Sequence, residues 1–84
     1  MEYKERHMDS AIEYVLYSWR IEAAIETPLM YNINWDNHHI IIYTNYPGKL
    51  IGMRGKHIEE FKKRMCEAWP LFEEFEIYET WGCI

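Results

Sequence analysis

The placement of glycine is the feature that most constrains what this chain can form. Gly48, Gly52 and Gly55 fall within eight residues, and the only other glycine is Gly82. Because glycine has no Cβ and accepts positive φ, a Gly-x-x-Gly turn lets the main chain approach a bulky anionic partner. The tetrapeptide Gly52-Met53-Arg54-Gly55 is therefore a candidate binding loop, whose value depends on the elements that flank it.

Basic residues gather at the same place. From Lys49 to Arg64 the chain has six basic and two acidic residues, a local charge of +4, while the remainder has three basic and twelve acidic residues, a charge of −9. A basic segment in an acidic body attracts a polyanion to that segment and repels it elsewhere. A solvated helix face is the alternative explanation of such a cluster.

Length and composition predict one small folded domain, spanning 1–84. Aromatic residues make up 17% of the chain, which favours a packed core over disorder. The longest aliphatic run is Ile40–Ile42, so we expect no signal peptide, no membrane partner and a cytoplasmic location. Cys66 and Cys83 form no Cys-x-x-Cys pair and are expected to be reduced thiols.

Hydrophobic periodicity predicts a helix and a hairpin in the first half. Apolar residues recur at spacings of three and four from Glu5 to Ile25, which is typical of an amphipathic helix, and Thr27-Pro28 ends it. Alternation predicts a strand from Leu29 to Trp35, followed by a two-residue turn at Asp36-Asn37. The second strand, His38 to Asn45, is apolar on both faces and is expected to be central or covered on both sides.

The second half predicts two helices around the glycine turn, then a strand. A short helix runs from Pro47 to Gly52, and a second follows Gly55 up to Pro70. The third strand has one polar face, because apolar and polar residues alternate around Phe75 to Trp81. Trp19, Trp69 and Trp81 fall on predicted core faces, whereas Trp35 and Tyr46 are candidate stacking platforms.

The segment Ile42 to Ile58 carries a family resemblance. A strand ending in Thr44 leads into Pro47-Gly48, an aliphatic pair, Gly-x-x-Gly and an isoleucine that opens the next helix. With this element order the chain resembles a type II KH domain over nearly its whole length, and it is similar to the KH domain of the bacterial small-subunit ribosomal protein at the mRNA entrance. The resemblance implies an α+β fold of order α-β-β-α-α-β, with three helices packed on one face of a three-stranded mixed sheet. Because the second domain of that ribosomal protein is absent and the body of this chain is acidic, we expect a stand-alone KH protein of a bacterium or a phage.

The resemblance further implies binding of single-stranded RNA, with the loop clamping about four nucleotides. The exposed amides of Gly52 to Gly55 would face the sugar-phosphate chain, with charge from Lys49, Arg54 and Lys56. Leu50 or Ile51, together with Ile58 and the third strand, would form an apolar groove for the bases. The implied binding residues are Lys49, Ile51, Gly52, Met53, Arg54, Gly55, Lys56, His57, Ile58, Phe75, Glu76 and Ile77.

The expected binding is weak. Met53 leaves a single charge inside the loop, so we expect an affinity of roughly micromolar for the isolated domain. Useful affinity would then come from a homo-oligomer or a larger ribonucleoprotein complex. Single-stranded DNA is an alternative ligand, and His57 is either a phosphate or base contact or a helix-start residue.

Catalysis, cofactors and metals have little support in the sequence. Adjacent His38 and His39 would point to opposite faces of a strand, and no partner residue has metal-ligand spacing. The glutamates from Glu73 to Glu79 are expected to form a solvated strand face rather than an acid-base pair. No nucleophile-and-base pairing is readable, so we expect a protein that is not an enzyme. The alternative function is a KH-fold protein-interaction module with weak or no nucleic-acid binding.

Overall fold

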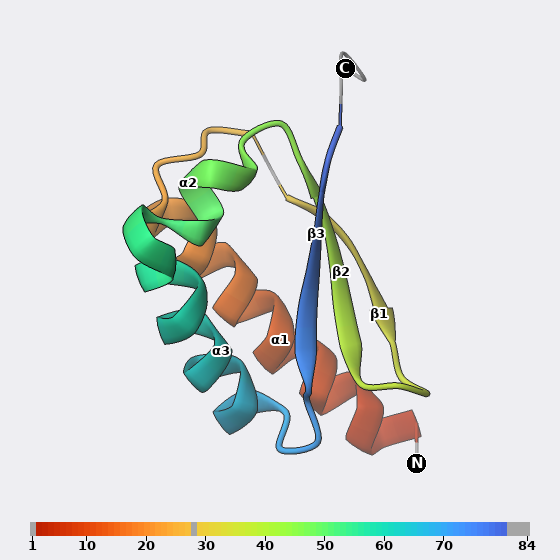
Figure 1. Ribbon diagram of the computed structural model, residues 1–84. Coiled ribbons are helices and arrows are strands. Elements are labelled where there is room, and N and C mark those ends of the chain that lie inside the picture. The colour runs from red at the N-terminus through yellow and green to blue at the C-terminus, as the bar shows by residue number, and fades with distance from the viewer. Residues whose placement is uncertain (1, 28, 81–84) are drawn as a thin grey trace.

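A three-stranded mixed sheet forms the centre of the molecule. The computed structural model describes residues 2–27 and 29–80, with side chains from residue 9 onward. Strand β2 (His39–Thr44) lies in the middle, antiparallel to β1 (Met30–Asn34) and parallel to β3 (Glu74–Glu79) (Figure 1). The expected central position of the second strand is confirmed. Met8, which is one of the apolar residues at helical spacing in the first predicted helix, lies outside the described side chains.

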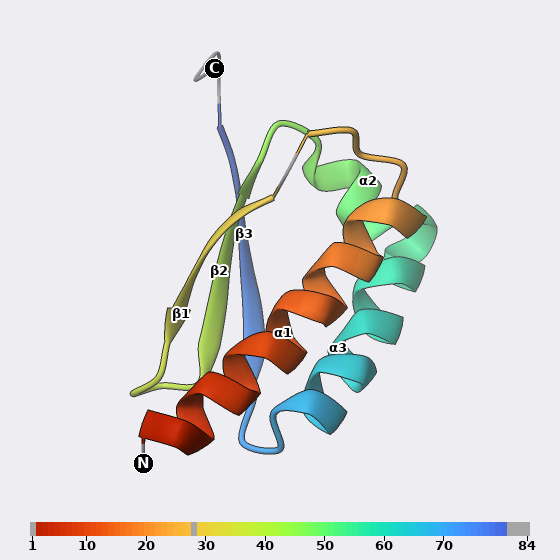
Figure 2. The same cartoon turned by 180° about the vertical axis from the view of Figure 1, so that it is seen from behind.

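Two long helices, α1 (Glu2–Glu22) and α3 (Lys56–Ala68), cover one face of this sheet (Figure 2). The third, α2 (Pro47–Ile51), is a helix of only five residues; Gly52 is its C-cap and leads into a 3-10 turn, η1 (Met53–Gly55). The expectation of three helices packed on one face therefore holds only for α1 and α3. The fold is α+β, as the sequence predicts.

The core lies between this sheet face and the helices. Trp19 is fully buried and its ring stacks on Phe61 at 5.4 Å between centroids and meets Phe75 at 4.7 Å. Burying an apolar side chain of this size stabilises the fold by about 1.5–3 kcal/mol. Trp19 Nε1 also donates to the Leu50 carbonyl oxygen at 2.9 Å, so α1 fixes the position of α2. The core placement of Trp19 and Trp69 is confirmed, and Trp81 lies outside the described residues.

Helix α1 ends earlier than periodicity predicts. Its last residue is Glu22, and Ala24 takes a left-handed conformation with φ of 59°. The Arg20 guanidinium donates to the carbonyl oxygens of Ile25 at 3.1 Å and Glu26 at 2.8 Å. These bonds supply donors to two carbonyl groups of the turn that follows the helix and tie that turn to the last turn of α1. Buried Ile25 is thus part of the turn after the helix and not of the helix itself.

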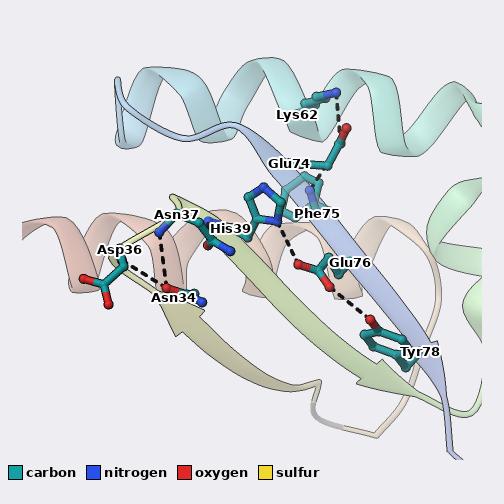
Figure 3. A network of polar contacts seen from close by, with 9 residues as sticks. All are labelled: Asn34, Asp36, Asn37, His39, Lys62, Glu74, Phe75, Glu76 and Tyr78. Atoms are coloured by element: carbon teal, nitrogen blue, oxygen red, sulfur yellow. Dashed lines mark hydrogen bonds and ion pairs between the residues drawn. The ribbon is translucent and has the colours of Figure 1, made fainter.

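The predicted two-residue turn at Asp36-Asn37 is wrong. The connection has four residues, 35–38, and His38 takes the left-handed conformation with φ of 64°. Asn34 Oδ1 accepts hydrogen bonds from the amides of Asp36 at 3.0 Å and Asn37 at 3.3 Å (Figure 3). The turn is longer because Trp35 leaves the sheet and packs edge-on against Trp69, with ring centroids 4.9 Å apart.

The other face of the sheet has no helix over it in the part of the chain that the structure describes. A polar network crosses this open face from β2 to β3. His39 Nδ1 lies 2.7 Å from Glu76 Oε2, and Tyr78 Oη donates to Glu76 Oε1 at 3.0 Å (Figure 3). Both contacts favour the carboxylate and lower the pKa of Glu76, the His39 bond most. No helix among the described residues is long and apolar enough to cross a membrane.

Candidate functional site

The backbone of the loop from Gly52 to Gly55 explains why its ends are glycines. Gly52 has φ of 77° and ψ of 168°, a region open essentially only to glycine. A Cβ there would lie 2.9 Å from both Cγ and the backbone nitrogen of His57. Gly55 is left-handed at φ 75°, but a Cβ would meet only Ile58 Cγ2 at 3.8 Å. Gly52 is therefore required by contact and conformation, and Gly55 by conformation alone.

Arg54 also takes a left-handed conformation, with φ of 59° and ψ of 26°. Few residues other than glycine adopt it, and asparagine and aspartate do so most readily. The sequence gives no signal for this conformation, because arginine carries no preference for it. It turns the peptide groups on either side of Arg54 at the tip of the loop, where Met53 is 84% exposed.

The amides of the loop divide into two pairs. Gly52 N–H donates to the Gly48 carbonyl oxygen at 2.9 Å, and Gly55 N–H donates to that of Gly52 at 3.0 Å. The amides of Met53 and Arg54 have no acceptor among the described residues. The expectation that all amides from Gly52 to Gly55 are open to a ligand is thus wrong for the two glycines, whose amides close the turn.

His57 joins the two helices that flank the loop. Its Nδ1 lies 3.2 Å from the Lys49 carbonyl oxygen, and its ring is packed under Gly52. The bond requires a proton on Nδ1, since a carbonyl oxygen only accepts. Of the two roles left open by the sequence, this geometry supports the helix-start residue that holds the loop in place.

The basic residues nearest the loop have no carboxylate partners. Lys49, Arg54 and Lys56 are exposed and make no ion pair among the described side chains. Lys49 Nζ lies over the Tyr46 ring, 4.8 Å from its centroid. Together with the two open amides they form the candidate site, which we call the clamp: Lys49, Met53, Arg54 and Lys56.

Further along α3 the positive charge is compensated. Arg64 pairs with Glu60 and with Glu22, the latter at 3.0 Å, and the Glu22 hydrogen bond raises the Arg64 pKa. Lys62 Nζ lies 2.9 Å from Glu74 Oε1, and this bond lowers the Glu74 pKa. The solvated helix face is therefore the better account of this part of the basic segment. The uncompensated charge is concentrated at the clamp, with Lys63 as the exception on α3.

Apolar side chains beside the clamp come from α2, the loop and α3. Leu50 is fully buried, whereas Ile51 is 38% exposed, so Ile51 is the residue that a ligand can reach. Ile58 of α3 is half-buried against the core. These residues with Met53 give the loop an apolar border, which is the surface that the sequence expects beneath the bases.

Two of the expected groove residues on β3 do not face this border. Phe75 is buried in the core between Trp19 and Phe72, so its side chain is closed to a ligand. Glu76 points to the open face of the sheet, where it bonds to His39 (Figure 3). Strand alternation is the reason, because neighbouring residues project to opposite faces. Of the three expected β3 residues, only Ile77 is placed on the helix side and partly exposed.

The structure places the two candidate stacking platforms, Tyr46 and Trp35, in different surroundings. Tyr46 is exposed next to Lys49, whereas Trp35 is half-buried against Trp69. The sequence misses a second aromatic pair, Tyr43 and Tyr78, stacked on the open face with centroids 6.0 Å apart. No group of three or more His, Cys, Asp or Glu residues that would hold a metal is present in the described part of the chain.

Comparison with known proteins gives no relative from which a function is transferred: no family model, no curated protein and no solved structure matches this chain.

Proposed function

We propose that this chain is a type II KH domain that binds single-stranded RNA through the clamp, in the cytoplasm and without catalysis. The observation that carries the proposal is the geometry of the loop. Two adjacent amides, those of Met53 and Arg54, are open at the tip of a turn whose glycines are needed by its backbone. Three exposed cations, Lys49, Arg54 and Lys56, belong to the loop and the residues next to it and make no ion pair among the described side chains, and a sugar-phosphate chain favours such positive charge.

The arrangement of the elements supports the family assignment. The fold is α+β, with two long helices on one face of a three-stranded mixed sheet, and this coarse arrangement is compatible with the resemblance. The loop joins α2 to α3, so the N-terminus of α3 adds its partial positive charge to the clamp. Gly55 is the N-cap of α3 and has no side chain to occupy that end.

A single strand fits this surface better than a duplex does. The apolar border of Ile51, Met53 and Ile58 suits unstacked bases, whose faces are hidden in a helix. If Lys49, Arg54 and Lys56 neutralise about three phosphates, the logarithm of the binding constant falls with the logarithm of the salt concentration with a slope of about −2. Single-stranded DNA is distinguished by comparing ribose and deoxyribose oligomers of one sequence at the same salt concentration.

A protein-interaction module is the second candidate function. The acidic remainder of the chain and the exposed apolar residues of α1, Tyr14, Tyr17 and Ile21, favour it. The two functions make different demands on the clamp, because an interaction surface on α1 does not need it.

The test is the double substitution Met53→Asp and Arg54→Asp, with binding measured by fluorescence anisotropy of short labelled RNA. Aspartate tolerates the left-handed conformation at position 54, so the loop backbone is retained. We expect binding to be lost and the melting temperature to change by only a few degrees, because both side chains are exposed.

Lys63→Asp is the matched control. Lys63 is an exposed cation of α3 without a carboxylate partner among the described side chains, and its substitution reverses a charge outside the loop. We expect it to weaken RNA binding far less than the double substitution. Equal losses in both variants, or unchanged binding in the double variant, contradict the clamp. A parent protein that binds no RNA favours the interaction module.

A further inference from the structure

The sheet has one unprotected edge. Strand β1 is an edge strand of the sheet and pairs with β2 without interruption over its five residues. It contains no charged residue and no proline, whereas β3 at the other edge carries Glu74, Glu76 and Glu79. Proteins usually protect exposed edges with charge, proline or a bulge, because an edge offers free amides and carbonyls to another strand.

Hollows lie on both sides of this edge. One of about 680 Å³ separates β1 from α1 and is lined by Glu13, Tyr14, Tyr17, Arg20, Leu29 and Tyr31, among others. The other, of about 430 Å³, runs along the open face and is lined by Asn32, Asn34 and Trp35. Because the side chains of a strand alternate, a strand added to β1 would send successive side chains into the two hollows.

Helix α1 presents an apolar ridge next to the same edge. Tyr14, Tyr17 and Ile21 are 72%, 58% and 53% exposed, and their spacing of three and four residues places them in one stripe. Single exposed apolar residues are ordinary, but a stripe beside an open strand edge is a surface of the kind that partners cover.

We propose that β1 pairs with β1 of a second copy, so that two sheets join into one of six strands. A twofold axis makes the two β1 strands antiparallel and brings the two α1 ridges together. Tyr31 and Ile33 of each copy would then face the helix-side hollow of the other, and Met30, Asn32 and Asn34 the open-face hollow.

The distribution of charge favours a second copy of this chain as the partner that pairs with the β1 edge. The seam between the strands is uncharged, so self-pairing brings no like charges together there. On α1 the acid and the base that line the hollow, Glu13 and Arg20, are seven residues apart, about 10 Å along the helix. In an antiparallel arrangement the Glu13 of each copy lies toward the Arg20 of the other, which complements the charges of both.

The position of the clamp agrees with this assembly. In Figures 1 and 2 the connection between α2 and α3 lies on the opposite side of the molecule from β1. A dimer built on β1 therefore leaves both clamps open. If the proposed RNA binding holds, two linked clamps raise the affinity for a long strand through effective concentration, while the dimer itself is independent of RNA.

Sedimentation equilibrium of the whole chain, without RNA, tests the dimer. We expect the average mass to rise with concentration from 10.3 kDa toward twice that value. Asn32→Lys places two like charges at the seam, and Tyr17→Glu puts a carboxylate into the ridge. Each is expected to weaken dimerisation by about tenfold or more. The β1 amides of the parent should exchange more slowly at high concentration.

Two control variants test whether any loss of dimerisation depends on the site of the substitution and not on the change in charge alone. Glu79→Gln makes the same change in net charge as Asn32→Lys, but on the β3 edge, and Leu71→Glu adds a carboxylate at an apolar residue that is 63% exposed away from α1. Both should dimerise as the parent does. Circular dichroism checks the fold of each variant. If one of the two interface variants, Asn32→Lys or Tyr17→Glu, fails to fold, the other is sufficient for the test. A parent that stays monomeric at all concentrations overturns the proposal, as does a dimer that neither Asn32→Lys nor Tyr17→Glu weakens.

Discussion

The two edges of the sheet differ in charge and in what lies beside them. The β3 edge is lined with glutamates, is tied to α3 by the Lys62–Glu74 ion pair, and lies on the side of the clamp. The β1 edge is uncharged and lies between two hollows, one of them lined by three tyrosines. One small domain thus places an acidic edge, which discourages strand pairing, on the side of the clamp, and an uncharged edge, which permits strand pairing, on the other side.

The uneven distribution of charge along the chain explains how a protein that is acidic overall is compatible with the proposed binding of a polyanion. Its −5 net charge says little about the clamp, because the cations of α3 beyond the loop are largely neutralised while those at the loop are not. The acidic remainder repels nucleic acid from the rest of the surface. Position of charge, rather than its sum, is what the proposed function depends on.

The largest effect is expected from Gly52→Ala. The new Cβ would meet the His57 ring and backbone at 2.9 Å in a conformation that alanine disfavours. We expect a loss of about 1–3 kcal/mol in the free energy of unfolding and loss of RNA binding. Thermal denaturation measures the loss of stability, and the fluorescence anisotropy of labelled RNA measures the loss of binding. The average mass in sedimentation equilibrium should be that of the parent, because Gly52 is not part of the proposed dimer interface.

Gly48→Ala is the control for that substitution. No heavy atom lies within 4 Å of a Cβ at Gly48, which is a residue of α2. Alanine is a better helix former, so we expect equal or slightly higher stability and unchanged binding. A Gly52→Ala variant as stable and as active as Gly48→Ala would contradict the account of the loop.

Tyr31 reports on the β1 side. Burial, with Glu13 as the second cause, raises its pKa from 10.0 to about 12. Because the folded state favours the neutral phenol, this contribution to stability is complete below pH 10 and is lost as pH rises toward 12. Ultraviolet titration should show a tyrosine transition near pH 12 in the parent that Tyr31→Phe lacks, whereas the raised pKa of Tyr78, caused by its hydrogen bond to Glu76, should be the same in both proteins.

Glu13→Gln sharpens the same measurement. Its amide keeps the size of the side chain but removes the charge and the carboxylate acceptor of the Tyr31 hydroxyl, which is 3.3 Å away. The pKa of Tyr31 should move part of the way back toward its ordinary value. A pKa that stays at about 12 would assign the shift to burial and to the charge of Asp9, and none of it to Glu13.

Smaller effects of opposite sign are expected at the ion pair between α3 and β3. Lys62→Gln leaves the Glu74 carboxylate without its partner near the expected path of the RNA, and Glu74→Gln leaves the lysine free. We expect RNA affinity to fall by about threefold in the first variant and to rise by about threefold in the second. Changes of the same sign in both variants would place the RNA elsewhere.

The smallest effect concerns acid. The Lys62 and His39 bonds lower the pKa values of Glu74 and Glu76 below the ordinary 4.5. Their contribution to stability is present above that value and is lost as pH falls through the lowered pKa values. Glu76→Gln should therefore unfold with a slightly weaker dependence on pH in acid, measured by circular dichroism. An unchanged acid transition would show that the network on the open face contributes nothing.

Local patterns predicted much of this fold. The period of two placed Phe75 and Ile77 on one face of a strand and Glu76 on the other, and the glycine spacing located the loop. Helical spacing likewise placed Trp19 in the core. These features follow from neighbours in the sequence, which is why they are readable without the structure.

Features set by tertiary packing were missed. The pairing of Trp35 with Trp69 lengthened the hairpin turn, and no local rule contains that contact. The bond between His39 and Glu76 depends on strand register, which the sequence leaves open. Whether the loop amides are free depends on hydrogen bonds within the turn, so the family resemblance overestimated their number.

Residue-by-residue chemical-shift mapping during titration with short single-stranded RNA tests the central claim most directly. We expect the largest amide shifts at Met53, Arg54 and Lys56, smaller shifts at Ile58 and Ile77, and none along β1 beyond those caused by dimerisation alone. Shifts that spare the loop, or that are largest on the open face or along β1, would contradict the assignment of RNA binding to the clamp.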